Sequence, residues 1–375
     1  MMVTLKPFDT IFFRDGKPFT SGEDVWANPV FPPNPSVLYG ALRSAYIAHN
    51  GGLTAFVNGL MKDSIGYIER RGDENVIHNG AFTLRGIFLN WSDMLYLPAP
   101  LDLVFDKNAD KSNKYKAHLM KMVSPTTSFF GNHVTQSMLF PQAIEEAESA
   151  DECFISLDDL NKYLNSSGNF ACTLKPRFDF ILNEPKTGIK ISDSKSAEEG
   201  YLYRAEMLRL ASKNPSGYRC DVGISVLLEG LKLVNFNGMI KIGGEGKGAF
   251  ALETSEYHLP EIAKESLKQI NNTKRFKLYI ATPCIFHNGW KPNIEQNNIT
   301  IHLLSACVGK FILCGGWDIY NNRPKTMYRA VPAGSVYYYE IKKGDAEDIL
   351  NAFHGKSISE YNSQQGFGIS YVGIG

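Results

Sequence analysis

The chain has 375 residues, 43% of them hydrophobic and 12% aromatic, and its 39 basic residues balance 39 acidic ones. This length exceeds one typical hydrophobic core, so two domains are expected. Zero net charge argues against a protein that coats nucleic acid through bulk electrostatics, and any RNA contact must therefore be a local patch. No apolar run approaches the length of a membrane span and the N-terminus lacks a signal-peptide layout, so no membrane contact is expected.

Six cysteines are scattered along the chain without a C-x-x-C pair. In a large chain without a signal peptide, such cysteines are expected to be reduced core residues, and a cytoplasmic location follows.

The first 105 residues predict a strand, a helix and a strand pair. Residues 2–14 are strand-like and turn at Asp15-Gly16. Asn34 is expected to cap a helix that begins at Pro35, with Arg43 off its apolar stripe. The strand pair is predicted over residues 82–89 and 94–105.

Residues 106–200 change character, because lysines punctuate a polar stretch that is followed by Ser/Thr-rich and acidic segments. This composition predicts an insertion with mobile parts on a compact core. The lysines are more typical of a solvated surface than of a binding site.

Four glycines fall within the six residues 243–248, together with Lys247. Glycines permit positive φ and leave the backbone N–H groups open to an anion, and Lys247 would add a mobile cation. A Walker loop needs Ser or Thr where Gly248 stands, and no helix signal follows. The segment therefore predicts a strand–loop–strand unit suited to an extended polyphosphate such as RNA, or else a plain tight turn.

The second half repeats a strand–helix rhythm. Strands are predicted over 276–281 and 336–341, whereas periodicity leaves 300–311 open between helix and strand. Asp345 is expected to cap a short helix that ends before Gly355, and a glycine loop at 366–368 feeds a last strand. Trp317 is expected in the core.

Each half thus matches a βαββαβ unit, although the second helix of the first unit is not evident. The fold class predicted is α+β, with two tandem ferredoxin-like (RRM-like) domains over residues 1–265 and 270–375 and the insertion at about 106–200.

Several blocks, in order along the chain, resemble the family of the third subunit of the Cmr complex, a RAMP-superfamily component of type III-B CRISPR effectors. The blocks are residues 14–19, 32–44, 97–102, 243–248, 316–318 with 323–325, 331–337 and the terminal Gly366-Phe367-Gly368. Their joint order carries the resemblance, and residues 106–200 match least.

The resemblance implies a non-catalytic scaffold in antiviral defence that grips the 5′ handle of the guide RNA (crRNA). It also implies docking on the large polymerase-like subunit, beside a neighbouring RAMP backbone subunit. Two alternatives stay open: a guide-processing endoribonuclease of the same superfamily, and a protein–protein adaptor whose glycine loops are only structural.

The residues predicted to contact RNA share a basic side chain or an exposed glycine backbone. They are Arg14, Lys17, Arg43, Gly243, Gly244, Gly246, Lys247, Gly248, Lys325 and Arg329. Lys325 and Arg329 straddle Tyr328, a mixture that suits single-stranded RNA but also a two-sided strand. Arg43 could equally be solvated, and Arg14 with Lys17 could belong to a polar hairpin.

The eight histidines form no H-x-x-H or H-E-x-x-H pattern, so no metal, cofactor or catalytic residue is predicted. His133 is the least implausible candidate for a processing nuclease. Docking on the large subunit is expected to use Phe129, Phe130, Met138 and Phe140, which could instead close a small core of the insertion.

Overall fold

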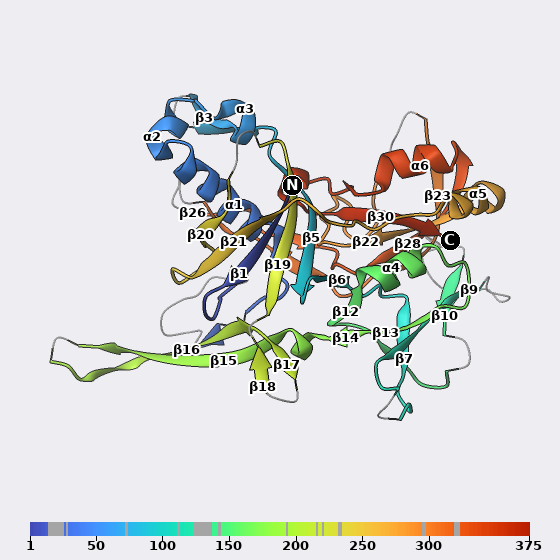
Figure 1. The fold of residues 1–375 in the computed structure, drawn as a ribbon, viewed down its shortest axis with the longest axis horizontal. Coiled ribbons are helices and arrows are strands. Elements are labelled where there is room, and N and C mark those ends of the chain that lie inside the picture. The colour runs from blue at the N-terminus through green and yellow to red at the C-terminus, as the bar shows by residue number, and fades with distance from the viewer. Residues whose placement is uncertain are drawn as a thin grey trace.

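The computed structural model describes residues 1–13, 26–27, 29–71, 74–110, 113–123, 137–141, 144–192, 194–214, 217–219, 221–231, 235–294, 298–318 and 323–375. It is a mixed α/β structure with several antiparallel sheets and few helices (Figure 1). None of the helices in these ranges combines the length and apolarity that a membrane crossing needs.

An eight-stranded sheet forms the first half of the molecule. Its spatial order is β14 (Lys175–Pro176), β12 (Cys153–Ser156), β6 (Met94–Pro98), β5 (Thr83–Trp91), β19 (Val222–Glu229), β1 (Met2–Pro7), β21 (Gly248–Thr254) and β20 (Gly238–Lys241). The predicted strand pair is confirmed as β5 and β6, with Leu89 opposite Tyr96. The second strand is shorter than predicted, because β6 ends at Pro98 and Leu103–Asp106 forms a strand of another sheet.

A five-stranded sheet forms the second half. Its order is β23 (Thr300–Cys307), β28 (Val336–Lys343), β22 (Arg275–Ile280), β30 (Ile369–Ile374) and β29 (Lys356–Ser357). The run that periodicity left open is therefore largely a strand, β23, which pairs with β28.

Six α-helices occur in the described ranges, and α4 lies between the two sheets (Figure 1). They are α1 (Pro35–His49), α2 (Gly52–Val57), α3 (Lys62–Ile65), α4 (Leu157–Leu164), α5 (Lys264–Thr273) and α6 (Ala346–Phe353). Asp345 caps α6 as predicted, within a full capping box. Asn34 occupies the N-cap position of α1, but its side chain makes no capping bond and faces Cys314 Sγ at 3.5 Å.

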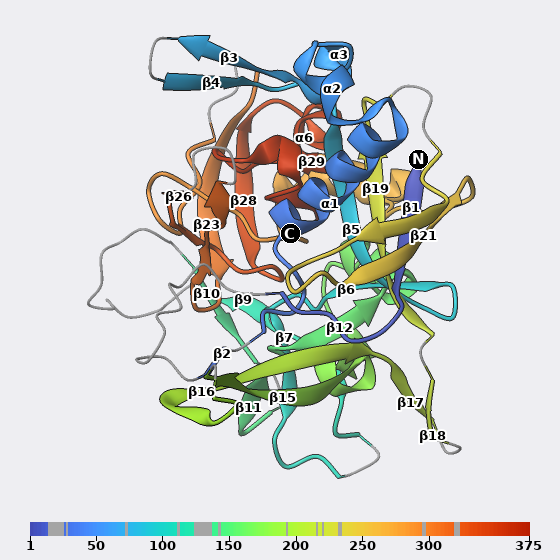
Figure 2. The ribbon, with the colours of Figure 1, turned by 90° about the vertical axis from the view of Figure 1, so that its left-hand side faces the viewer.

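Smaller strand units complete the fold. A four-stranded sheet has the order β11 (Ala147–Ser149), β7 (Leu103–Asp106), β8 (Lys116–Leu119) and β13 (Ala171–Thr173). A long hairpin of β15 (Ile181–Ile191) and β16 (Ala197–Leu210), joined by β2 (Trp26–Ala27), projects from the body (Figures 1 and 2). The two-stranded units are β3 (Tyr67–Arg71) with β4 (Glu74–His78), β9 (Lys121–Val123) with β10 (Met138–Phe140), β17 (Ser212–Asn214) with β18 (Gly217–Arg219), β24 (Ile312–Cys314) with β27 (Tyr328–Ala330), and β25 (Trp317–Asp318) with β26 (Arg323–Pro324).

The core has three main layers. The first lies between α1 and the large sheet, and the third between the smaller sheet and helices α5 and α6. The middle layer joins the two sheets through α4, whose Leu160, Tyr163 and Leu164 are fully buried. Part of the predicted insertion is thus core structure, because β12 extends the large sheet and α4 packs on β30.

Candidate nucleic-acid interface

The glycine segment connects β20 to β21, so the predicted strand–loop–strand arrangement is confirmed. Within the loop the Ile242 amide donates to the Lys247 carbonyl at 2.9 Å, which closes the turn. Gly243, Glu245 and Gly246 have φ values of 71°, 57° and 62°. Positive φ at three positions within four residues explains why glycine is needed here, and residues 243–246 are all exposed.

The loop rests on the chain segment that follows β1. The Gly244 amide donates to the Phe12 carbonyl at 3.0 Å. A Cβ on Gly243 would lie 2.6 Å from the same carbonyl oxygen, so a side chain cannot be accommodated there without movement. Two residues further on comes Arg14, which with Lys17 lies outside the described residues. The structure therefore brings the glycine loop against Phe12, close in sequence to the predicted basic pair.

Lys247 is not the mobile cation that was predicted. Its side chain is only 15% exposed, and its Nζ donates to Thr10 Oγ1 at 3.0 Å and lies 3.9 Å from Asp9 Oδ2. Burial and the neighbouring Lys186 lower the pKa of Lys247, against the carboxylates of Asp9 and Glu245. Its charge is thus held at the base of the loop.

The base of the β15–β16 hairpin supplies the other charges of this surface. Ile11 and Leu208 exchange backbone hydrogen bonds at 2.7 and 2.9 Å, which fixes the hairpin beside the loop. Arg209 of β16 bonds Glu184 and, at 2.8 Å, Asp9 Oδ1.

These contacts neutralise some charged side chains of this surface and leave Lys186 exposed. The Thr10 backbone amide and the Arg209 guanidinium lower the pKa of Asp9, and Arg209 lowers that of Glu184, so Arg209 is neutralised locally. Lys186 of β15 is exposed and stands near Lys247. Sequence reasoning missed it, because only the tertiary contact between hairpin and loop reveals its position.

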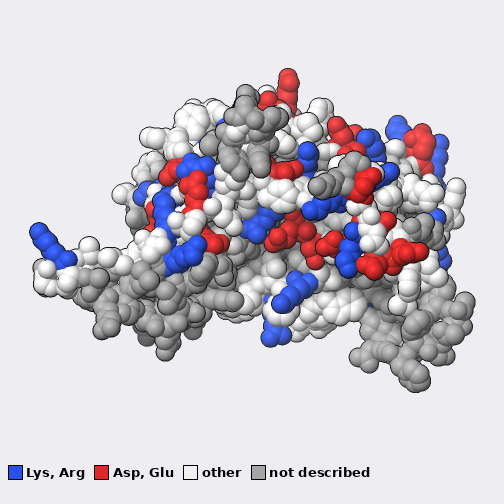
Figure 3. All heavy atoms as spheres, turned by 90° about the horizontal axis from the view of Figure 1, so that it is seen from below, with Lys and Arg blue, Asp and Glu red and all other residues white. Residues whose placement is uncertain are grey.

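Among the described residues, the arrangement places backbone amides without partners beside two lysines on one surface of the molecule. Within the described part of the chain, the Glu245 and Gly246 amides have no hydrogen-bond partner. Exposed backbone amides in left-handed turns bind phosphate oxygens, and Lys247 and Lys186 add positive charge at the base. On the face shown in Figure 3, basic and acidic side chains are interspersed, which agrees with a local contact rather than a broad basic surface.

Arg43 is engaged inside its own domain. Its Nη2 donates to the Ile65 carbonyl at 3.2 Å, and its guanidinium lies 5.0 Å from the centroid of the Phe56 ring. Burial lowers the pKa of Arg43, but an arginine stays charged at physiological pH. These contacts connect α1 to α2 and α3.

Lys325 and Arg329 are exposed on the strand pairs of the second half. The Arg329 guanidinium lies 4.9 Å from the centroid of the Phe311 ring, and Tyr328 stacks on Tyr361. The prediction of a buried Trp317 is wrong, because its side chain is 54% exposed on β25.

Two of the sequence blocks form the seam between the halves. Leu101 N donates to Gly334 O at 2.8 Å, and Tyr279 Oη donates to Pro98 O at 2.6 Å. A Cβ on Gly334 would lie 2.5 Å from Ala99 O, so this glycine is needed for the close approach. The blocks at 97–102 and 331–337 therefore position the two halves.

A cavity of about 400 Å³ lies beside this seam, lined chiefly by apolar residues that include Phe31, Pro98 and Pro332. The Gly366–Gly368 block also packs between the halves, because a Cβ on Gly366 would lie 2.9 Å from the Cβ of Leu84 in the first half.

The remaining functional candidates are only partly placed. His133, Phe129 and Phe130 lie outside the described residues. Met138 and Phe140 of β10 are exposed, at 37% and 47%. Among the described residues, no group of three or more His, Cys, Asp or Glu side chains is arranged to hold a metal ion.

Comparison with known proteins defines the class. A family model described as "CRISPR-associated protein (Cas_Cmr3)" matches residues 3–374, so the chain belongs to this family of CRISPR-associated proteins. No match was found among curated proteins.

Solved structures with a related arrangement come from CRISPR complexes. A chain of the type III-B Cmr-beta complex bound to cognate target RNA is 16% identical, with a TM-score of 0.49 over 94% of this chain and 88% of that one. A chain of the same complex with target RNA and AMPPnP is 17% identical, with a TM-score of 0.48 over 94% and 89%. A chain of the Csm3–Csm4 subcomplex of type III-A is 15% identical, with a TM-score of 0.34 over 92% and 94%.

Proposed function

We propose that this chain is a non-catalytic scaffold of a type III-B CRISPR effector complex and that it binds the 5′ handle of the guide RNA. Membership of the Cas_Cmr3 family across residues 3–374 is the observation that carries the proposal. The exposed amides of the glycine loop supply a physical means of holding RNA.

In this proposal the handle backbone crosses the glycine loop. One phosphate accepts hydrogen bonds from the amides at Glu245 and Gly246, and Lys186 and Lys247 face the same phosphate or the next. A charge-assisted contact of this kind is worth about 1.5–3 kcal/mol, which is about a 10- to 150-fold change in affinity. Such contacts position the RNA without reading its bases.

The proposal extends to the architecture, as two tandem ferredoxin-like domains that meet near residues 265–270. The strand order β21-β1-β19-β5 and the order β30-β22-β28-β23 both follow the 4-1-3-2 pattern of a βαββαβ unit. Each unit keeps one of its two crossover helices in the described ranges, α1 in the first and α6 in the second. The insertion lies between the second and third strands of the first unit.

The same proposal includes docking on the large polymerase-like subunit and on a neighbouring RAMP subunit. The burial pattern of β10 supports a contact with a neighbouring subunit near residues 124–141. Met138 and Phe140 are exposed, whereas Leu139 between them packs against the middle core.

The RNA contact is tested with a fluorescent RNA that carries the repeat-derived 5′ handle. Lys186→Ala is the cleaner variant, because Lys247→Ala also removes the bond to Thr10. Lys268→Ala, an exposed lysine on α5, is the matched control. In the assembled complex, Lys186→Ala and Lys247→Ala should each weaken handle binding about tenfold or more. The factor should be similar for any handle sequence, and the salt dependence of binding should fall by roughly one phosphate contact.

Unchanged affinity and salt slope in both folded loop variants would show that the loop is only a turn. The RNA recovered from each titration should be intact, with or without divalent metal. Site-specific cleavage that disappears in His133→Ala would replace the scaffold with the guide-processing nuclease.

A further inference from the structure

One face of the large sheet is only half covered. The face opposite α1 packs against the middle core through Met2, Phe88, Leu95 and Leu97. The middle core covers this face only as far as β1, the third strand from the β20 edge of the sheet. On β1 itself the outward side chains of Met2 and Thr4 are buried and only Lys6 is exposed, whereas the outward side chains of β21 and β20 are exposed or half-buried. The other face of these strands is buried under α1 through Leu5, Ala251 and Ile240.

This uncovered region carries an apolar strip that we call the open-face patch. Its members are Phe8 (56% exposed), Met239 (76%), Phe250 (39%) and Leu252 (37%). The strand register makes the patch continuous, because Phe250 lies opposite Met239 on one side and opposite Lys6 on the other. The Phe8 and Phe250 rings meet edge to face, 6.5 Å apart. Exposed apolar residues in a continuous group usually mark an interaction surface.

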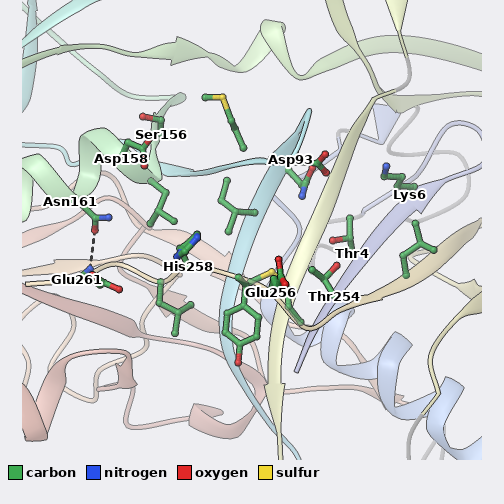
Figure 4. A pocket seen from close by; sticks show the side chains of 18 residues that line it. Thr4, Lys6, Asp93, Ser156, Asp158, Asn161, Thr254, Glu256, His258 and Glu261 are labelled. Atoms are coloured by element: carbon green, nitrogen blue, oxygen red, sulfur yellow. Dashed lines mark hydrogen bonds between the residues drawn. The ribbon is translucent and has the colours of Figure 1, made fainter.

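A cavity of about 720 Å³ adjoins the patch, and its lining includes Leu252 of the patch and Lys6, which lies opposite Phe250. Four exposed acidic residues surround it: Asp93, Asp158, Glu256 and Glu261. Asp93 follows β5, Asp158 lies in the first turn of α4, and Glu256 and Glu261 lie on the segment between β21 and α5 (Figure 4). None of the four carboxylates has a salt-bridge partner among the described residues. With Lys6 as the one lysine or arginine of the lining, the cavity is strongly acidic.

We infer that the open-face patch and this acidic cavity together form a docking site for a protein neighbour. The segment that fits them places apolar side chains on Phe8, Met239 and Phe250 and a Lys or Arg in the cavity. The unpaired carboxylates specify the basic group by charge complementarity, and the patch supplies the desolvated centre that a lasting contact needs. This inference rests on the proposed function, because the neighbour is taken to be another subunit of the same assembly.

The charge pattern distinguishes this site from an RNA surface. Exposed aromatic rings beside Lys6 and Lys241 would suit a stacked base. However, the phosphates of a strand lying on the patch would pass the four carboxylates, and like charges at this range repel. An added lysine on this face should therefore weaken docking of a basic protein segment, whereas it should strengthen the binding of RNA.

The test uses Met239→Lys, Glu256→Lys and the double variant, none of which disturbs a buried residue. Binding of each full-length variant to the purified large subunit, and separately to the neighbouring RAMP subunit, is measured without RNA. Guide-handle binding is measured in parallel. Phe311→Lys is the matched control, since Phe311 is 48% exposed on a different surface. Hydroxyl-radical footprinting compares Met239 and Phe250 in the free and bound chain.

The double variant should lose at least tenfold in affinity for one of the two subunits, with Phe311→Lys unchanged. Met239 and Phe250 should be reactive in the free chain and protected in the complex. Equal subunit binding by wild type and double variant would overturn the inference, as would protection of Met239 already in the free chain. A gain in RNA affinity with unchanged subunit binding would assign the face to RNA instead. If the wild-type chain binds neither subunit, the assembly role in the proposed function fails, whereas a wild-type chain that binds and a double variant that binds equally well overturn this inference alone.

Discussion

At the scale of single residues, the most constrained group is a buried cluster around Asp102. Its carboxylate accepts hydrogen bonds from Tyr163 Oη at 2.8 Å and from Tyr338 Oη at 2.6 Å. Lys277 is also buried, and its Nζ lies 3.6 Å from the centroid of the Tyr163 ring. The cluster therefore joins the β6–β7 turn, α4 and both central strands of the second sheet.

Removal of Asp102 should be costly. Asp102→Ala leaves two hydroxyls without their acceptor and Lys277 without a counter-charge, and loss of one partner of a buried charge pair costs about 3–5 kcal/mol. Denaturant unfolding should show a loss of this size, compared with less than about 0.5 kcal/mol for Asp151→Ala, which changes an exposed aspartate of the insertion. A loss of under about 1 kcal/mol in Asp102→Ala would show that the cluster contributes little.

The same cluster predicts a pH dependence. Burial raises the pKa of Asp102 and lowers the pKa of Lys277 to about 8 from its ordinary 10.5. Between pH 8 and 10 the unfolded chain holds a proton at Lys277 that the folded chain has begun to lose, so stability should rise with pH across this range. The single variant Lys277→Met keeps Asp102 but lacks the titrating amine. Its free energy of unfolding should therefore rise less between pH 8 and 10, measured by the same unfolding experiment.

At the scale of elements, the glycine loop allows a graded test of backbone strain. Gly243 combines positive φ with contact to Phe12 O, Gly246 has positive φ in open space, and Gly244 has neither positive φ nor a contact closer than 3.5 Å. Alanine should therefore destabilise most at 243, by about 2–4 kcal/mol, by about 1 kcal/mol at 246, and least at 244. Thermal unfolding of the three variants gives the order, and equal values would remove the steric explanation.

Local signals predicted some elements well and others poorly. The Asp345 capping box and the β5–β6 pair depend on neighbouring residues, and both were predicted. Asn34 has the right residue type at the N-cap of α1, but its side chain contacts Cys314, far away in sequence, instead of capping the helix. Lys247 has the right charge in the glycine loop, but Thr10 and Asp9, far away in sequence, hold it. Lys186 had no local signal, because its place beside the loop exists only once the hairpin is docked.

At the scale of the whole molecule, the two halves share one core. The middle layer draws buried residues from both sheets, among them Phe88 and Leu97 from the first and Tyr279 and Tyr371 from the second. We therefore predict that residues 1–262 expressed alone expose apolar surface and bind the dye ANS, and that the full chain unfolds in one transition. Two separate transitions in calorimetry, together with a well-folded isolated first half, would contradict a shared core.

The position of α4 sets an order in which this protein can be completed during synthesis. Its buried face packs on β30, which leaves the ribosome about 200 residues later. At translation rates of about 5–20 residues per second, that surface stays uncovered for about 10–40 seconds. A nascent chain arrested between α4 and β30 should thus be a substrate for chaperones, whereas one arrested beyond β30 should not.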